Sequence, residues 1–93
     1  MENFDEYTKN TTYRVRSVEG KYYIFGNHKC FELNELGAIV WKYIEEEISV
    51  EDFCKRVIRK YKDCTYEGVL EDLNKFIEFL VLEGMIDERR CTE

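Results

Sequence analysis

The 93-residue sequence contains no proline, a single histidine and no apolar run near the roughly 20 residues that a membrane-spanning helix needs. Its N-terminus lacks the basic and then apolar pattern of a signal peptide, so the sequence predicts a cytoplasmic protein with no membrane partner. Acidic residues outnumber basic ones by 20 to 14, which gives a net charge of −6. With 44% hydrophobic and 15% aromatic residues, the chain can build one core without metals or disulfides, and intrinsic disorder is disfavoured.

Known catalytic patterns are also absent. The sequence has no Gly-x-Ser-x-Gly, no glycine-rich phosphate loop and no His-Glu-x-x-His. His28 falls in a predicted turn, where a solvated side chain is the simplest interpretation. The carboxylates of Glu67, Glu71 and Glu78 are typical of a solvated helix face. The sequence therefore predicts a protein that is not an enzyme and holds no cofactor.

The cysteines at positions 30, 54, 64 and 91 form no Cys-x-x-Cys pair. Structural zinc sites usually present their ligands in closely spaced pairs, whereas the spacings here are 24, 10 and 27 residues. Cys54 lies on the apolar face of a predicted helix, where a buried thiol behaves as a small hydrophobe. We expect free thiols and no metal site, and a metal or redox protein that uses these cysteines is an alternative.

The chain divides into a loose N-terminal arm over residues 1–11, a folded domain over 12–86 and a frayed tail over 87–93. The arm is polar and lacks periodicity, and we expect it to become ordered only against a partner.

Alternating apolar and polar residues predict an antiparallel meander of three strands at the start of the domain. The first two strands form a hairpin around Glu19-Gly20, and Gly26-Asn27 turns the chain into a third strand over 29–33. Phe31 and Leu33 point to one side of that strand.

Three helices are predicted to follow the strands. Asn34, Ser49 and Thr65 each precede a run of apolar residues with helical spacing, and each can cap a helix with its side-chain oxygen. The third helix is the longest and ends at Gly84. Three strands followed by three helices predict an α+β, winged helix-turn-helix-like fold in which a three-stranded antiparallel sheet packs on the helices.

DNA binding is the first function that a winged-helix fold suggests, but the charge of the third helix argues against it. Residues 65–83 carry five acidic residues against Lys75 alone, a net charge of −4. Phosphate contacts supply most of the affinity for nucleic acids, so this helix would be repelled. The second helix has a basic face, which fits solvent or a docking partner. A winged-helix transcriptional module that binds DNA is the alternative function.

The third strand has one neighbour in the predicted meander, so its other edge leaves backbone N–H and C=O groups unpaired. An extended peptide can pair with such an edge while side-chain pockets beside it set specificity. Phe79 and Leu82 lie outside the main apolar arc of the third helix and Phe76 lies at its border, so these residues are candidates for a pocket wall. The alternative is that they cover the C-terminal tail or the first helix.

Two segments carry a family resemblance. Residues 31–41, Phe-Glu-Leu-Asn-Glu-Leu-Gly-Ala-Ile-Val-Trp, resemble the Leu-Asn … Ile-Trp segment of PqqD-like proteins, also called RiPP recognition elements. Residues 72–86 are similar to that family's Asp-Val-x-x-Phe-Leu-x-x-Leu-x-x-x-Gly-Leu-Ile ending. Glu45-Glu46-Glu47 stands where the family often has an Asp-Gly turn. The resemblance covers residues 12–86.

The resemblance implies a protein that binds the leader segment of a ribosomally made precursor peptide as an added strand between the third strand and the third helix. It also implies a partner enzyme that modifies the peptide, such as a radical enzyme, a cyclase or a leader protease. A homodimer through the open edge is a further use of that edge. The residues expected to bind the peptide are Lys29, Cys30, Phe31, Glu32, Leu33, Val69, Asp72, Leu73, Phe76, Phe79 and Leu80.

Overall fold

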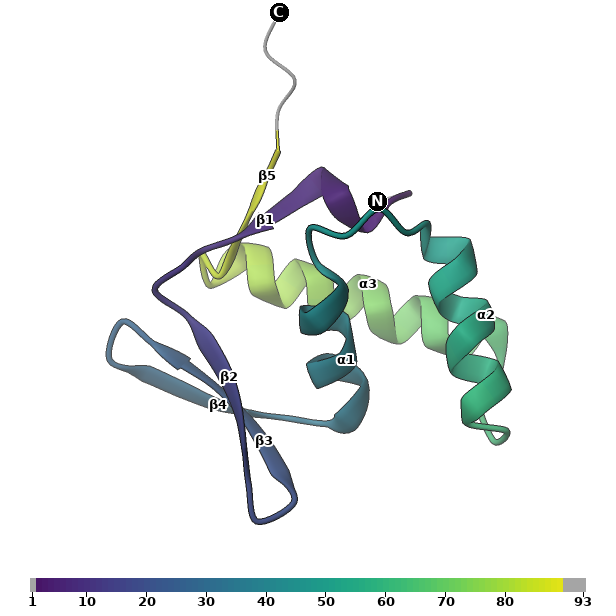
Figure 1. Ribbon diagram of the computed structural model, residues 1–93, viewed down its shortest axis with the longest axis horizontal. Helices are drawn as coiled ribbons and strands as arrows, with labels where there is room; N and C mark the ends of the chain where they lie inside the picture. Colours follow the sequence, from purple (N-terminus) through teal and green to yellow (C-terminus); the bar gives the residue numbers. More distant parts are fainter. Residues whose placement is uncertain (1, 90–93) are drawn as a thin grey trace, which may run out of the picture.

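A small antiparallel sheet followed by three helices forms the body of the molecule (Figure 1). The computed structural model describes residues 2–89. The strands are β2 (Arg14–Val18), β3 (Lys21–Gly26) and β4 (Lys29–Leu33), and the helices are α1 (Glu35–Tyr43), α2 (Val50–Lys60) and α3 (Tyr66–Leu82). The strand order is β2-β3-β4, which confirms the predicted meander and the α+β class. Within residues 2–89, no helix is both long and apolar enough to cross a membrane.

Two tight turns set the register of this sheet. The central pairs Glu19-Gly20 and Asn27-His28 all have positive φ, at 52°, 81°, 54° and 65°, which is the signature of the type I′ hairpin turn. The second turn is therefore centred one residue later than the expected Gly26-Asn27. Gly26 belongs to β3 instead, and a Cβ at this position would lie 2.3 Å from the backbone oxygen of Thr12. This close approach of two backbone segments requires glycine.

Each helix begins after the polar residue predicted to cap it. The side-chain oxygens of Asn34, Ser49 and Thr65 each accept a backbone N–H from three residues on, at 2.7, 3.0 and 3.1 Å. These bonds satisfy donors that have no partner inside the first turn. Gly84 follows α3 with a φ of 74°, as expected for a glycine that ends a helix.

One hydrophobic core lies between the sheet and the helices, and α3 crosses behind α1 in Figure 1. Cys54 is fully buried in this core, as predicted, and burial raises the pKa of its thiol. The largest fully buried side chains are Phe4, Ile24, Ile44, Phe53, Leu73, Leu80, Met85 and Ile86.

The N-terminal arm belongs to this core, which corrects the expectation of a loose segment. Phe4 is 0% exposed, and its ring centroid lies 4.8 Å from that of Phe53 in α2. The arm also pairs with the loop between α1 and α2, because the Phe4 N–H donates to the Ile48 carbonyl at 2.9 Å and the Glu45 N–H donates to the Phe4 carbonyl at 3.0 Å. Burial of one large aromatic ring thus ties the first residues of the chain to two helices.

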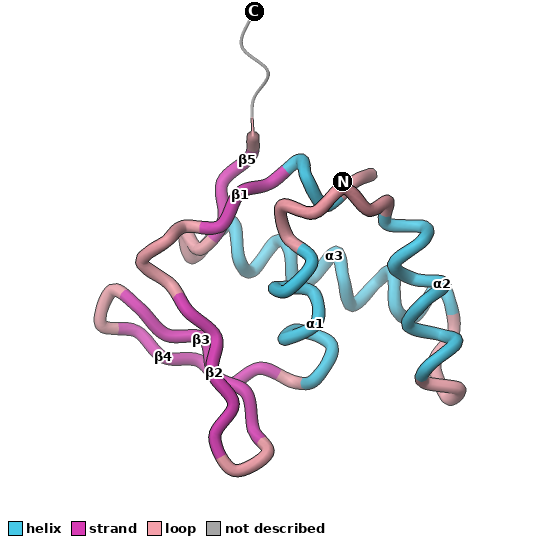
Figure 2. The backbone as a smooth tube through the Cα atoms, viewed as in Figure 1, coloured by secondary structure: helices cyan, strands magenta, loops and turns pink. Residues whose placement is uncertain are grey.

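The arm continues into a second sheet, which Figure 2 shows above the three-stranded one. Strand β1 (Tyr7–Lys9) pairs antiparallel with β5 (Ile86–Glu88) near the C-terminus. The predicted frayed tail is therefore wrong for residues 87 and 88, which are paired, while residues 90–93 lie outside the described part. This pairing holds residues 7–9 and 86–88 side by side.

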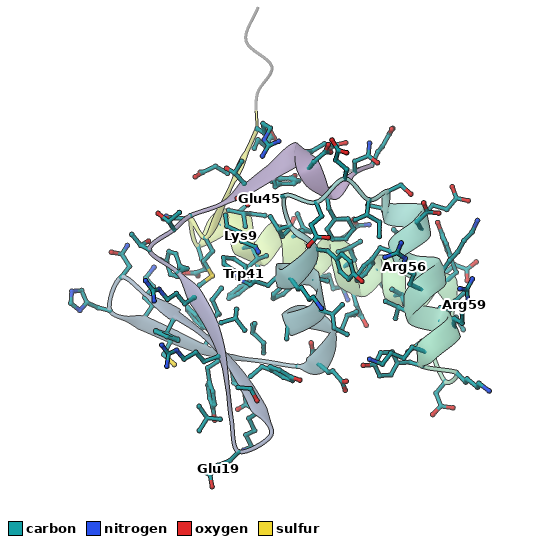
Figure 3. All side chains as sticks on the ribbon, in the orientation of Figure 1. Lys9, Glu19, Trp41, Glu45, Arg56 and Arg59 are labelled. Carbon is teal, nitrogen blue, oxygen red and sulfur yellow. The ribbon has the colours of Figure 1, made fainter. Side chains whose placement is uncertain are left out.

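Lys9 joins the arm to α1, as Figure 3 shows. Its backbone N–H donates to the Glu45 carboxylate at 2.7 Å, and its ammonium lies 5.5 Å from the ring centroid of Trp41. Such a cation–π contact contributes about 0.5–1 kcal/mol at a partly exposed site.

We predict that Phe4→Ala lowers the free energy of unfolding by about 3–5 kcal/mol, because it leaves a cavity beside Phe53. Denaturant titration followed by circular dichroism measures the change. Val18→Ala is the control, since that side chain is 51% exposed and its truncation should change stability by less than about 0.5 kcal/mol. Equal stability of the Phe4→Ala and wild-type proteins would contradict a structural role for the arm.

Candidate functional site

Strand β4 has one free edge, and the register of the sheet determines which backbone groups lie along it. Within residues 2–89, β4 pairs with β3 and with no other strand. The type I′ turn makes Gly26 and Lys29 a hydrogen-bonded pair, and hydrogen-bonded pairs alternate along an antiparallel ladder. The N–H and C=O groups of Cys30 and Glu32 therefore point to the free edge. The backbone groups of Lys29, Phe31 and Leu33 point to β3.

Helix α3 runs beside β4 in the opposite direction. At one end of the strand, the Lys29 ammonium lies 3.1 Å from the Glu83 carboxylate near the end of α3. Two residues further along β4, the rings of Phe31 and Phe79 meet edge to face with centroids 5.3 Å apart. The hydrogen bond to Glu83 raises the pKa of Lys29. The Lys29 side chain is exposed and that of Glu83 is half-buried, so the pair adds little stability.

Three half-buried rings, Phe31, Phe76 and Phe79, form what we call the aromatic cluster. The rings of Phe76 and Phe79 stack with centroids 6.0 Å apart. Phe76 also packs on the start of α1, where a Cβ on Gly37 would lie 3.3 Å from the ring. Leu82, one turn beyond Phe79, is 79% exposed. Phe76 thus covers part of α1, as the alternative prediction had it, while Phe79 packs on β4 and leaves apolar surface beside the free edge.

The structure brings only some of the predicted site residues to this surface. Cys30 and Glu32 have exposed side chains, and the alternation of the strand places them on the face of the sheet opposite Phe31. Leu73 and Leu80 are 0% exposed and belong to the core, so the prediction that they contact a ligand is corrected. Helical periodicity identifies the apolar side of a helix, but it does not distinguish fully buried residues from partly exposed ones. The remaining predicted residues are placed as follows: Leu33 and Val69 are buried, Phe31, Phe76 and Phe79 are half-buried, and Lys29 and Asp72 are exposed.

Beyond the C-terminal end of β4, a cavity of about 440 Å³ lies between the starts of α1 and α3 and the loop that joins α2 to α3. We call it the α1–α3 cavity. Of the predicted residues, Val69 and Asp72 line it. Glu35, Tyr61 and Asp63 also line it. No local pattern in the sequence identifies these three residues, because only tertiary packing brings the start of α1 to the end of α2.

Two residues that line this cavity are joined by a hydrogen bond. The Tyr61 hydroxyl, just after α2, donates to the Glu35 carboxylate in the first turn of α1. That bond, aided by desolvation, raises the pKa of Tyr61 to about 12. The pair therefore joins α1 to α2 most firmly while the hydroxyl keeps its proton.

Within residues 2–89, no group of three or more His, Cys, Asp or Glu side chains is placed to hold a metal ion. Cys30 and Cys64 are exposed free thiols, and Cys91 lies outside the described residues.

Comparison with known proteins points to one family. The family model of coenzyme PQQ synthesis protein D (PqqD) matches residues 17–86. Among solved structures, the fold is similar to that of TbiB1 in complex with the TbiA(beta) leader peptide, with a TM-score of 0.70 and 15% sequence identity over 90% of this chain and 99% of that chain. A search of curated protein sequences gives no significant match. The structural similarity confirms the predicted fold.

We predict that Glu35→Gln lowers the pKa of Tyr61 from about 12 towards its ordinary value of 10.0. Because the folded-state pKa is the higher one, the stabilisation by this bond is complete below about pH 10 and is lost as the pH rises to about 12. Tyrosine 13Cζ chemical shifts, with Tyr61→Phe for assignment, follow the titration. Glu67→Gln on the exposed face of α3 should leave the titration unchanged, and an identical effect of both substitutions would contradict the pairing.

Proposed function

The chain belongs to the PqqD family, and on this premise we propose that it binds the leader segment of a ribosomally made precursor peptide. The observation that carries the proposal is the free edge of β4 with the aromatic cluster beside it. The similarly folded TbiB1 structure is a complex with a leader peptide, which supports the same use of the fold. We further propose that the protein performs no catalysis itself and presents the leader to a modifying enzyme.

The leader would bind as an added strand along β4. Cys30 and Glu32 each offer one N–H and one C=O to such a strand, so up to four main-chain bonds can form. These groups have no strand partner within residues 2–89, and pairing replaces their bonds to water. Pairing along the free edge would not distinguish one leader sequence from another, because only backbone atoms take part.

Selectivity would come from the aromatic cluster. Phe79 reaches over Phe31 from α3, and Leu82 extends the apolar surface towards solvent. An apolar side chain of the leader that points towards α3 would bury against these rings. Leader peptides are disordered alone and lose conformational entropy on binding, which favours an affinity suited to handover rather than permanent capture.

A second copy of the chain could use the same free edge. In a homodimer, two β4 strands would pair through the backbone groups of Cys30 and Glu32, and the leader would have to displace the partner. Sedimentation analysis with and without a leader peptide separates the two uses of the edge. We propose the monomer as the binding form, because β4 is short and its edge side chains Lys29 and Glu32 are charged.

We predict that the leader protects the amides of Cys30 and Glu32 from hydrogen exchange, while those of Lys29, Phe31 and Leu33 change little because they already bond to β3. The probe is a synthetic leader peptide, with its sequence to be taken from a short precursor reading frame sought beside this protein's gene, and NMR-detected exchange resolves single amides. Protection of all five amides alike would contradict the register, and protection confined to α2 would move the site away from β4.

We predict that Phe79→Ala weakens leader binding by about 1–2 kcal/mol, the usual scale for losing an apolar anchor. Calorimetric titration measures the affinity, and denaturant unfolding shows whether the variant remains folded. Val81→Ala is the matched control, since it lies in the same helix, is 42% exposed and faces β5 rather than β4.

Asp72→Asn in the same titration tests whether a charge on α3 helps to orient the leader. Unchanged affinity of both the Phe79 and the Asp72 variants would place the site elsewhere. The basic face of α2 would then be the next candidate, where Figure 3 shows Arg56 and Arg59.

A further inference from the structure

The α1–α3 cavity has a composition that selects one kind of side chain. Its volume of about 440 Å³ falls within the usual range for ligand sites. Leu36, Val57 and Val69 provide apolar walls, and the carboxylate-bearing residues Glu35, Asp63 and Asp72 line the same space. Within residues 2–89, no lysine or arginine lines it.

Three side-chain oxygens that line the cavity already accept a hydrogen bond. Asn34 accepts the Gly37 N–H, and Thr65 accepts the Gly68 N–H. Glu35 accepts the Tyr61 hydroxyl. In the described part of the chain, Asp63 and Asp72 make no salt bridge and no side-chain hydrogen bond, so their carboxylates are available to a ligand.

The starts of α1 and α3 add positive potential to the cavity, and the carboxylates outweigh it. A helix N-terminus contributes roughly half a positive charge, so the two starts together contribute about one. Three carboxylates line the cavity, and their charge exceeds that contribution. The caps also occupy N–H groups that an anion would otherwise use. The balance therefore favours a cation over an anion.

The cavity continues the proposed peptide path. Asn34 follows directly after β4, and α3 runs antiparallel to β4 from Glu83 at one end to Asp72 and Val69 at the other. A leader residue just beyond the one that pairs with Glu32 therefore reaches the cavity. An apolar stem would pack on Leu36 and Val69 while a charged end meets the carboxylates.

We propose that the α1–α3 cavity is a subsite for a basic side chain of the leader, a lysine or an arginine, whose stem packs on the apolar walls and whose charge pairs with Asp63 and Asp72. This proposal rests on the proposed leader binding and names the chemistry that one part of the site selects. The aromatic cluster would select an apolar residue, and the cavity would select a basic one further along the same strand.

The first test uses benzamidine, benzamide and benzoate, which share one ring and carry a positive, a neutral and a negative group. We expect benzamidine to shift the amide signals of Leu36, Gly68 and Val69 in NMR titrations and to bind about three- to fivefold more tightly than benzamide, with benzoate weakest. The double variant D63N/D72N should lose the preference for the cation. D87N, which removes an exposed charge on β5, should keep it.

The second test uses the precursor peptide and applies a double-mutant cycle. Each lysine or arginine of the leader is replaced by methionine, which keeps an apolar stem. One replacement should lower the affinity for the wild-type protein about three- to fivefold and leave the affinity for D63N/D72N unchanged.

The outcomes separate this proposal from the proposed function. Benzamide or benzoate binding as tightly as benzamidine, or signal shifts confined to residues outside the cavity, would overturn the basic subsite. If the amides of Cys30 and Glu32 are protected by the leader while every basic residue can be replaced without loss, leader binding stands and the subsite fails. If benzamidine binds in the cavity and no leader protects β4, the cavity remains a cation site and the proposed function fails.

Discussion

The attachment of β4 to the helices through one face is the constraint on which the candidate site depends. The type I′ turn at Asn27-His28 fixes the register, so Phe31 packs on α3 while the backbone groups of Cys30 and Glu32 face outward. A shift of one residue would turn every side chain of the strand to the other face of the sheet. One short turn therefore determines both how the core closes and which amides remain for a partner.

The second sheet explains why that edge stays open. The segment after α3 pairs with β1 as β5 and, within residues 2–89, adds no strand to β4. The arm that supplies β1 is held by Phe4 in the core and by Glu45, a non-glycine residue with a φ of 82°. Such a conformation costs of order 1–3 kcal/mol, and the two hydrogen bonds that Glu45 makes to the arm offset it. Strands β1 and β5 thus pair with each other rather than with β4.

Local signals in the sequence were sufficient for the fold and insufficient for the site. The caps at Asn34, Ser49 and Thr65, the period of each helix and the alternation of β4 each act within a few residues, and the structure confirms them. The burial of Phe4 and the pairing of β1 with β5 depend on contacts across the whole chain, which no local pattern reports. For the same reason, local patterns do not predict the α1–α3 cavity. They also do not show that Leu73 and Leu80, which were expected to contact a ligand, are fully buried.

The magnitudes indicate how the two parts of the site divide the work. Four backbone bonds at about 0.5–1.5 kcal/mol each are comparable to the roughly 2–5 kcal/mol that ordering a disordered peptide costs. In the proposed complex, pairing along β4 would therefore offset the ordering of the leader, and the net affinity would depend on the leader's side chains. In the proposed complex, those contacts would come from the stripe of α3 that carries Asp72, Phe76 and Phe79. This stripe lies about 100° around the helix from the buried stripe of Leu73, Ile77 and Leu80. Because the two stripes are separate, the surface that distinguishes one peptide from another can change while the core of the fold is kept.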